Sequence, residues 1–451
     1  MKEEKKLNKK KIIAIISCII VVLIVVVCFM IALKKHNSSV SSTGSTKSSA
    51  SSISSEYDNI DYGTSTSLSS DKITEGGSYN ITGTHTCITI NTTDNVELNL
   101  NNATITCTSG PAINVEDADT VSIVLTGENK ITSTTTEELD GAIYSKDDLV
   151  FSGNGSLEIT SNYDGIVSKD TLVFKSGTYV IKASDDGIRG KDNVAIVDGN
   201  FTINAAYDGI KSTDEEDTTK GYVAIDGGTF NITSGTDAIQ AETEMVIKGG
   251  VFTIKTTGTT SADSHKGLKA VTLLQLDGGT FTMDTTDDGI HSNGDIILNK
   301  GEVTITSKDD AIHADALVEI NDGTYTVNAS EGIEGTYVKI NEGNITINAS
   351  DDGINAGQKS NKYTPTIEIN GGNITIKMGS GDTDAIDSNG NIYVNGGTLN
   401  ITANSAFDYD GEAKYTGGKM IINGEETTTI TNQMMGGGMH GGMRNGGGPR
   451  H

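Results

Sequence analysis

The chain has 451 residues and a formal net charge of −27, with only 5% aromatic residues and no tryptophan. Residues 1–35 carry eight Lys and two Glu, so the remainder holds 25 basic and 58 acidic residues, a net charge of −33. This excess argues against nucleic acid or an anionic membrane surface as the partner of the main body, and it suits a protein that binds cations.

The N-terminal segment has the pattern of a membrane anchor. Residues 1–11 contain six Lys, and residues 12–33 form an apolar run long enough to span a bilayer. Only Lys34 and Lys35 follow the run, so we expect residues 1–11 to be cytoplasmic and the body to be extracellular. The run is long for a signal peptide and lacks an Ala-x-Ala site, which favours an uncleaved single-pass anchor in the cell membrane over a cleaved signal.

Two segments of biased composition flank the body. Residues 34–70 are rich in Ser and Thr and almost free of apolar side chains, which predicts a flexible spacer. Residues 434–451 are rich in Gly and Met and are predicted to be disordered. A site for a soft metal ion such as Cu(I) is the alternative interpretation of this tail.

The body, residues 71–433, carries a repeat of about 22 residues, which is typical of a solenoid. An acidic column of Asp-Gly-Ile-like sequences is followed, usually after 13 residues, by a glycine column. The acidic column comprises Asp164, Asp186, Asp208, Asp237, Lys266, Asp288, Asp310, Glu331, Asp352, Asp384 and Ser405. The glycine column comprises Gly177, Gly199, Gly228, Gly250, Gly279, Gly301, Gly323, Gly343, Gly372, Gly397 and Gly418.

Each repeat predicts one coil of a right-handed parallel β-helix. Ile345, Ile347 and Ala349 alternate with polar residues before a turn at 350–353, and no apolar period of 3.6 residues occurs in the body. We therefore predict an all-β, single-domain solenoid with stacked Ile, Val and Phe in its core.

The acidic column is the candidate metal site. Equivalent carboxylates on adjacent coils would lie about 4.8 Å apart and repel one another. Calcium suits such a row because it accepts many oxygen ligands in irregular geometry. The candidate ligands are Asp185, Asp186, Asp208, Asp287, Asp288, Asp309, Asp310, Asp351, Asp352 and Asp384. The alternative is that these residues are ordinary solvated turn residues.

Departures from the repeat length adjoin the acidic column, whereas the glycine column is almost invariant. The insertions are 212–222, 256–264, 357–364 and 378–383. Insertions on one face of a solenoid usually build a binding face, although this corner could merely tolerate them. We therefore predict a groove along Asp208, Asp237, Lys266, Asp288, His291, Asp310 and His313.

Lys266 stands where neighbouring coils have Asp, and it could be an internal counter-ion or the base of a β-elimination. His291 and His313 occupy equivalent places on consecutive coils, where they could simply stack or bind a transition metal. Cys87 and Cys107 do not occupy the same place in the repeat, so the sequence leaves open whether they form a disulfide.

Three sequences, SDDGI at 350–354, DGGTF at 226–230 and SHKGLK at 264–269, resemble a family of exported clostridial carbohydrate-binding proteins. These are right-handed parallel β-helices similar in fold to pectate and other polysaccharide lyases. The resemblance covers roughly residues 80–420 and implies calcium at the DDGI-like corners. It also implies binding of acidic polysaccharides such as polygalacturonic acid, without lyase activity. Glu331 and Ser405 depart from the pattern.

The leading hypothesis is a monomeric, surface-anchored protein that binds acidic polysaccharide through calcium. A chain with few aromatic residues is poorly suited to neutral glucans, and an acidic groove would repel an acidic sugar unless calcium bridged them. The alternatives are a pectate-lyase-like eliminase with calcium and Lys266 as base, and a structural stalk or adhesin. Arg189 is the only Arg of the body, which disfavours the eliminase.

Overall fold

The computed structural model describes residues 49–259, 264–380 and 383–433. The predicted cytoplasmic segment, membrane anchor and Met/Gly tail lie outside this part of the chain. Among the described residues, no helix has both the length and the apolar character needed to cross a membrane.

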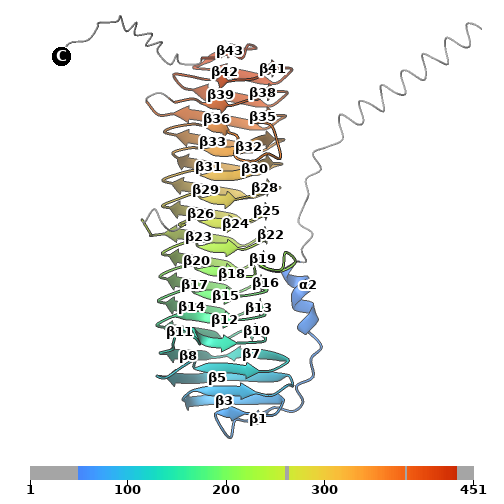
Figure 1. Ribbon diagram of the computed structural model, residues 1–451, viewed down its shortest axis with the longest axis vertical. Helices are drawn as coiled ribbons and strands as arrows, with labels where there is room; N and C mark the ends of the chain where they lie inside the picture. The colour runs from blue at the N-terminus through green and yellow to red at the C-terminus, as the bar shows by residue number, and fades with distance from the viewer. Residues whose placement is uncertain (1–48, 260–263, 381–382, 434–451) are drawn as a thin grey trace, which may run out of the picture. The chain divides into compact units, whose positions relative to one another are not determined.

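The described chain is an all-β solenoid in which each strand pairs in parallel with its equivalent on the next coil (Figure 1). A typical coil consists of β27 (Ile290–Ser292), β28 (Asp295–Leu298) and β29 (Glu302–Ser307). These strands pair with β24 (Leu268–Ala270), β25 (Leu273–Leu276) and β26 (Thr280–Thr285) of the coil before. The predicted parallel solenoid is therefore confirmed.

The strand register confirms that both sequence columns repeat without a slip. Ile290, two residues after the acidic column, pairs with Leu268 and Ile312 at the same place in their coils. Glu302, one residue after the glycine column, pairs with Thr280. Every glycine of the second column has a positive φ, between 77° and 157°. Residues with a side chain rarely adopt that backbone conformation, which explains why this column is glycine.

The core is the predicted stack of apolar side chains. Phe201, Phe230, Phe252 and Phe281 lie on consecutive coils with ring centroids 5.0, 4.5 and 4.5 Å apart. All four are at most 2% exposed. Burying one such side chain stabilises the fold by roughly 1.5–3 kcal/mol, so the column stabilises the stacking of each coil on its neighbours.

Part of the predicted Ser/Thr-rich spacer packs on the solenoid. Helix α2 (Ala50–Ser54) buries Ala50 and Ile53 against an outward-facing apolar patch that includes Val173 and Ala195. The hydroxyl of Tyr57 also donates a hydrogen bond to Asp148 over 2.9 Å. Two apolar residues in a Ser-rich segment produce no periodic pattern, and their docking patch begins at Val150, far away in the chain.

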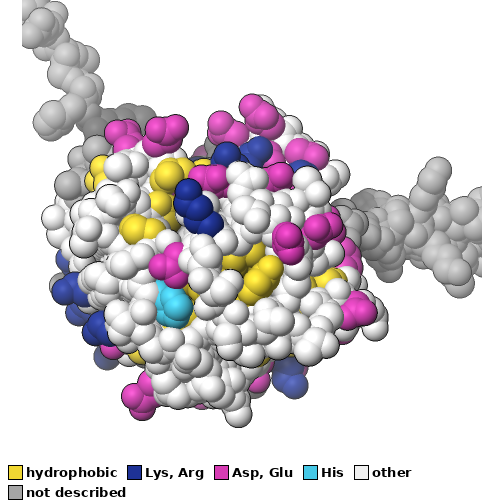
Figure 2. Space-filling view, turned by 90° about the horizontal axis from the view of Figure 1, so that it is seen from below, with side chains coloured by type: hydrophobic (Ala, Val, Ile, Leu, Met, Phe, Trp, Pro, Cys, Tyr) yellow, Lys and Arg dark blue, Asp and Glu magenta, His cyan; other side chains and the backbone are white. Residues whose placement is uncertain are grey.

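The two ends of the stack are closed differently. Near the first coils, Cys87 and Cys107 form a disulfide between the residue before β4 (Ile88–Asn91) and the end of β5 (Val96–Cys107). Figure 2 shows the end that holds β1 (Thr66–Ser67), where hydrophobic side chains lie in small separate areas. At the other end, β42 (Lys419–Ile422) pairs antiparallel with β43 (Glu425–Thr427), so a hairpin covers the last parallel edge.

Candidate functional site

The Asp-Asp corners place their two carboxylates in different surroundings. The second Asp is buried at three corners, with Asp186, Asp288 and Asp310 only 6, 2 and 6% exposed, whereas Asp352 is partly exposed. The first Asp reaches solvent, since Asp287 is partly exposed and Asp309 is exposed. We call the second residues the inner acids and Asp185, Asp287, Asp309 and Asp351 the outer acids.

The inner acids hold consecutive coils together. Oδ1 of Asp288 accepts a hydrogen bond from the backbone N–H of Asp310, 3.1 Å away on the next coil. An equivalent bond from the backbone of the next coil is accepted by Asp164, Asp186, Asp208, Asp237 and Asp352. A carboxylate that accepts a backbone N–H in a buried turn has a structural role, which the sequence pattern alone could not distinguish from metal binding.

A second column lies three residues after the inner acids, and its basic members supply counter-ions to several of them. It comprises Arg189, Lys211, Gln240, Lys269, His291, His313, Glu334, Asn355, Asp387 and Asp408, which pair in register from strand to strand. Lys211 lies 2.8 Å from Asp208, and Lys269 lies 3.1 Å from Asp237. We call this the counter-ion column. Its spacing was visible in the sequence as a basic residue after several of the Asp-Gly-Ile-like corners.

The predicted groove residues are adjacent but mostly buried. Asp208, Asp237 and Asp288 are at most 4% exposed, and His291 is 8% exposed. A glycan could not contact carboxylates that are enclosed by their own coil and paired with lysine or histidine. Most side chains of the predicted groove are therefore enclosed, and the outer acids are the accessible carboxylates of this corner.

Lys266 fits the counter-ion interpretation. Its Nζ lies 2.9 Å from Asp287 and 2.8 Å from Asp288. Burial would lower the pKa of Lys266, but the charges and hydrogen bonds of Asp288 and Asp287 outweigh burial and raise it. A lysine that acts as a base must give up its proton readily, so the raised pKa disfavours that role.

The counter-ion column loses its positive charge toward the C-terminus, where its members become Glu, Asn and Asp. Burial there raises the pKa of Glu331 to about 7 and that of Asp352 to about 7, and neighbouring carboxylates add to both shifts. Burial and Asp408 likewise raise the pKa of Asp387 to about 6. Within the described residues, none of the three makes an ion pair with a basic side chain.

Five of the predicted metal ligands lie in two convergent groups, one of which also includes Asp164, which was not predicted as a ligand. Asp164, Asp185 and Asp186 each offer an oxygen within 4.8 Å of the others, and Asp287, Asp288 and Asp309 form a second such trio. Arg189 and Lys211 pair with the first trio. Lys266 pairs with the second, where His291 also contacts Asp288. In the described chain, Asp351, Asp352 and Asp384 do not form a trio of this kind.

Two tyrosines beside the acidic corner were not among the residues predicted from the sequence to bind a glycan. Tyr163 and Tyr207 precede the inner acids of two Tyr-Asp-Gly corners, with the outer acid Asp185 on the coil between them. Tyr207 is 53% exposed, and its backbone N–H donates to the carbonyl of Asp185 over 3.3 Å. The sequence signal was the Tyr-Asp-Gly motif on either side of an Asp-Asp-Gly.

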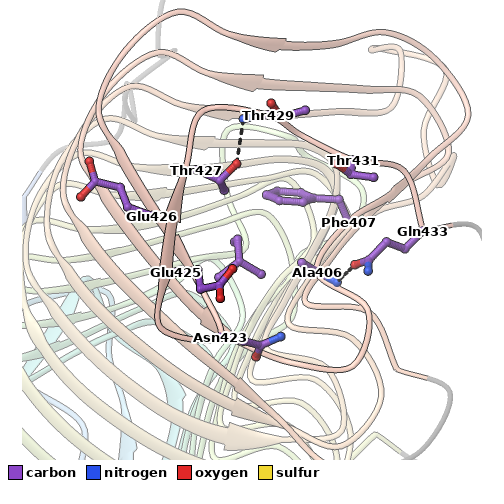
Figure 3. Close-up of a pocket in the computed structure, with 10 residues that line it drawn as sticks. Ala406, Phe407, Asn423, Glu425, Glu426, Thr427, Thr429, Thr431 and Gln433 are labelled. Carbon is purple, nitrogen blue, oxygen red and sulfur yellow. Dashed lines mark hydrogen bonds between the residues drawn. The ribbon is translucent and has the colours of Figure 1, made fainter.

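Hollows also occur away from the acidic column. One of about 540 Å³ lies at the C-terminal end, where Phe407, Glu425 and Gln433 contribute to its lining (Figure 3). Another, of about 570 Å³, lies along the glycine column between Lys248 and Asp322. The glycine side is therefore less smooth than the invariant spacing predicts.

A family model described as "Carbohydrate-binding domain-containing protein" matches residues 67–311 and 304–440. The chain belongs to this family. Its predicted place among carbohydrate-binding proteins is thereby confirmed, and polysaccharide is supported as the class of partner.

One solved structure is also similar, described as "Structure of the polysaccharide lyase-like protein from C. thermocellum, Gadolinium derivative". It is 28% identical, with a TM-score of 0.37, and the match covers 47% of this chain and 84% of that chain. No curated protein matches the chain.

Proposed function

We propose that the protein binds acidic polysaccharide at the cell surface through calcium held by the outer acids. The observation that carries this proposal is the division of the corner into inner acids, which hold the fold, and outer acids, which reach solvent. Family membership supports carbohydrate as the partner. Residues 12–33 would anchor the protein in the membrane, with the body acting as a monomer outside the cell.

The Asp287, Asp288 and Asp309 trio has the chemistry that calcium requires. Lys266 pairs with Asp287 and Asp288, while Asp309 adds a third carboxylate, so the trio offers several oxygen ligands to a divalent ion. Burial raises the pKa of Asp309, and repulsion from Asp288 and Asp287 raises it further. A hard cation with oxygen ligands would relieve that repulsion. Calcium bound there would bridge to the carboxylate of a uronate unit.

The Asp164, Asp185 and Asp186 trio is the second candidate. Burial raises the pKa of Asp185, and the charge of Asp186 adds to it, although Arg189 partly compensates. Tyr163 and Tyr207 flank Asp185 on the coils before and after. Tyrosine rings beside a calcium-binding carboxylate could pack on sugar rings while the ion holds the sugar carboxylate.

The lyase alternative has less support. The raised pKa of Lys266 keeps its ammonium protonated between Asp287 and Asp288, which is the state of a counter-ion. A stalk or adhesin without a glycan partner would not require exposed carboxylates beside tyrosines. Following unsaturated product from polygalacturonate tests the lyase directly, and we expect none above background.

A glycan array probed with the full-length protein, once in calcium and once in chelator, tests the proposed function. We expect uronate polymers to bind only in calcium, and Tyr207→Ala to weaken that binding. The matched control is Tyr415→Ala, which changes a tyrosine in the last coil that is also partly exposed. Equal uronate binding with and without calcium would contradict the calcium requirement, and binding of no acidic glycan would contradict the proposal as a whole.

A further inference from the structure

Two histidines of the counter-ion column lie next to each other on adjacent coils. His291 of β27 pairs in register with His313 of β30 (Ile312–Ile320), and the ring centroids are 4.9 Å apart. Both Nδ1 atoms approach the same oxygen, Oδ2 of Asp288, at 2.8 Å from His291 and 3.8 Å from His313. The three potential ligand atoms all lie within 4.8 Å of one another.

More carboxylates surround His313 than one counter-ion needs. Its Nδ1 is also 2.9 Å from Oδ2 of Asp310 and 3.3 Å from Oε2 of Glu334. On preceding coils, Lys211 and Lys269 hold the equivalent place as ammonium groups, which have no lone pair to donate to a metal. Imidazole can donate one, so at these two coils the column changes from point charges to side chains that are able to ligate a metal.

We propose that Asp288, His291 and His313 form a binding site for a divalent transition-metal ion such as Zn²⁺. In a tetrahedral zinc site with bonds near 2.1 Å, ligand atoms are about 3.4 Å apart, which lies within the separations found here. Asp310 or Glu334 is placed to supply a fourth ligand next to His313. The bound ion would join two consecutive coils.

The mixed nitrogen and oxygen ligands separate this site from the proposed calcium sites. Imidazole nitrogen suits zinc and similar ions, whereas calcium takes oxygen ligands. Asp288 and His291 are buried, but the side chain of His313 is 14% exposed, so an ion can enter from its side. The calcium proposal rests on the outer acids Asp287 and Asp309, and this inference rests on His291 and His313, so either can fail alone although Asp288 belongs to both groups.

Cobalt absorption tests the site in the full-length protein. Co²⁺ bound by histidine and carboxylate gives visible ligand-field bands, and Zn²⁺ should displace it while excess Ca²⁺ should not. The background variant His440→Ala/His451→Ala removes the tail histidines as a second source of binding. In that background we expect about one equivalent of Co²⁺ per chain and a higher Tm in Zn²⁺.

The informative variants are taken from the repeat itself. His291→Lys restores the residue found at this place one coil earlier, Lys269, and His313→Asn introduces the one found two coils later, Asn355. His291→Lys preserves the counter-ion, so the fold should persist while the cobalt bands and the zinc-dependent rise in Tm disappear. The matched control Lys269→Gln, which copies Gln240, should keep both signals.

Three results would overturn the proposed metal site. Absence of cobalt bands in the background variant would overturn the site, as would bands that survive in both His291→Lys and His313→Asn. If one variant failed to fold, the other would still decide the question. Displacement of Co²⁺ by Ca²⁺ would overturn the site as well, because it would mean that the ion is held by oxygen ligands alone.

Discussion

The carboxylate of Asp288 accepts a backbone hydrogen bond from Asp310 of the next coil at Oδ1, 3.1 Å away. Its other oxygen, Oδ2, lies 2.8 Å from the ammonium of Lys266. Burial would raise the pKa of Asp288, but the hydrogen bond from His291 and the charge of Lys266 hold it well below its usual range. The inner acid is therefore ionised and used by the fold, which leaves the binding of glycan through calcium to the outer acids.

Asp288→Asn should destabilise the protein. The amide retains an acceptor for the backbone of Asp310 but removes the negative charge that Lys266 and His291 face, at a cost of about 1–3 kcal/mol. Thermal unfolding followed by circular dichroism measures the change. Asp309→Asn, at the exposed outer acid of the next corner, is the control and should shift stability by no more than about 0.5 kcal/mol. Equal destabilisation by both variants would contradict the distinction between inner and outer acids.

Lys266→Ala should lower stability without removing a catalytic function. The substitution leaves Asp287 and Asp288 without their shared ammonium, so repulsion at the corner increases. Unfolding in urea should show a lower midpoint, and added calcium should recover part of the loss. Turnover of polygalacturonate that is present in the wild type and absent from a folded Lys266→Ala variant would instead support the lyase.

Stability in chelator should fall as the pH rises from about 4 to 7, because of Glu331 and Asp352. Both pKa values are raised to about 7, so the folded state binds more protons than the unfolded state in that interval. Glu331→Gln/Asp352→Asn should therefore raise Tm at pH 8 and change it little at pH 4. Asp322→Asn, at an exposed site beside the glycine column, is the control. A double variant with no gain at pH 8 would show that these carboxylates do not destabilise the fold when ionised.

Ile53→Asn should release the N-terminal segment around α2 without unfolding the solenoid. Ile53 is 5% exposed and packs on the patch that contains Val173, so a polar side chain there loses about 2–4 kcal/mol of local packing. Hydrogen exchange should become fast for residues 50–57 and for the β13 surface (Thr171–Phe174) only. The exposed neighbour Ser52→Ala should leave exchange unchanged. Faster exchange throughout the coils would mean that this segment supports the whole fold.

The coil and its register could be predicted from the sequence because the same structural requirement recurs at each column in nearly every coil. The glycine column needs a positive φ, and the acidic column needs an acceptor for the next turn. The inner burial of Asp288 was beyond prediction, because the Lys266 and His291 that enclose it approach its carboxylate only after the coils stack. The docking of Ile53 was missed for a similar reason, since the outward-facing Val173 and Ala195 look like core residues in the sequence.

The most direct test of the central claim removes the outer charges and leaves the inner ones. Titration of the full-length protein with polygalacturonate in calcium should show strong binding by the wild type and at least about tenfold weaker binding by Asp287→Asn/Asp309→Asn. The control Glu302→Gln/Asp322→Asn removes the same charge beside the glycine column, where both side chains are exposed, and should bind like the wild type. If the two double variants bind the polymer equally well, the outer acids do not hold the bridging calcium and the central claim is wrong.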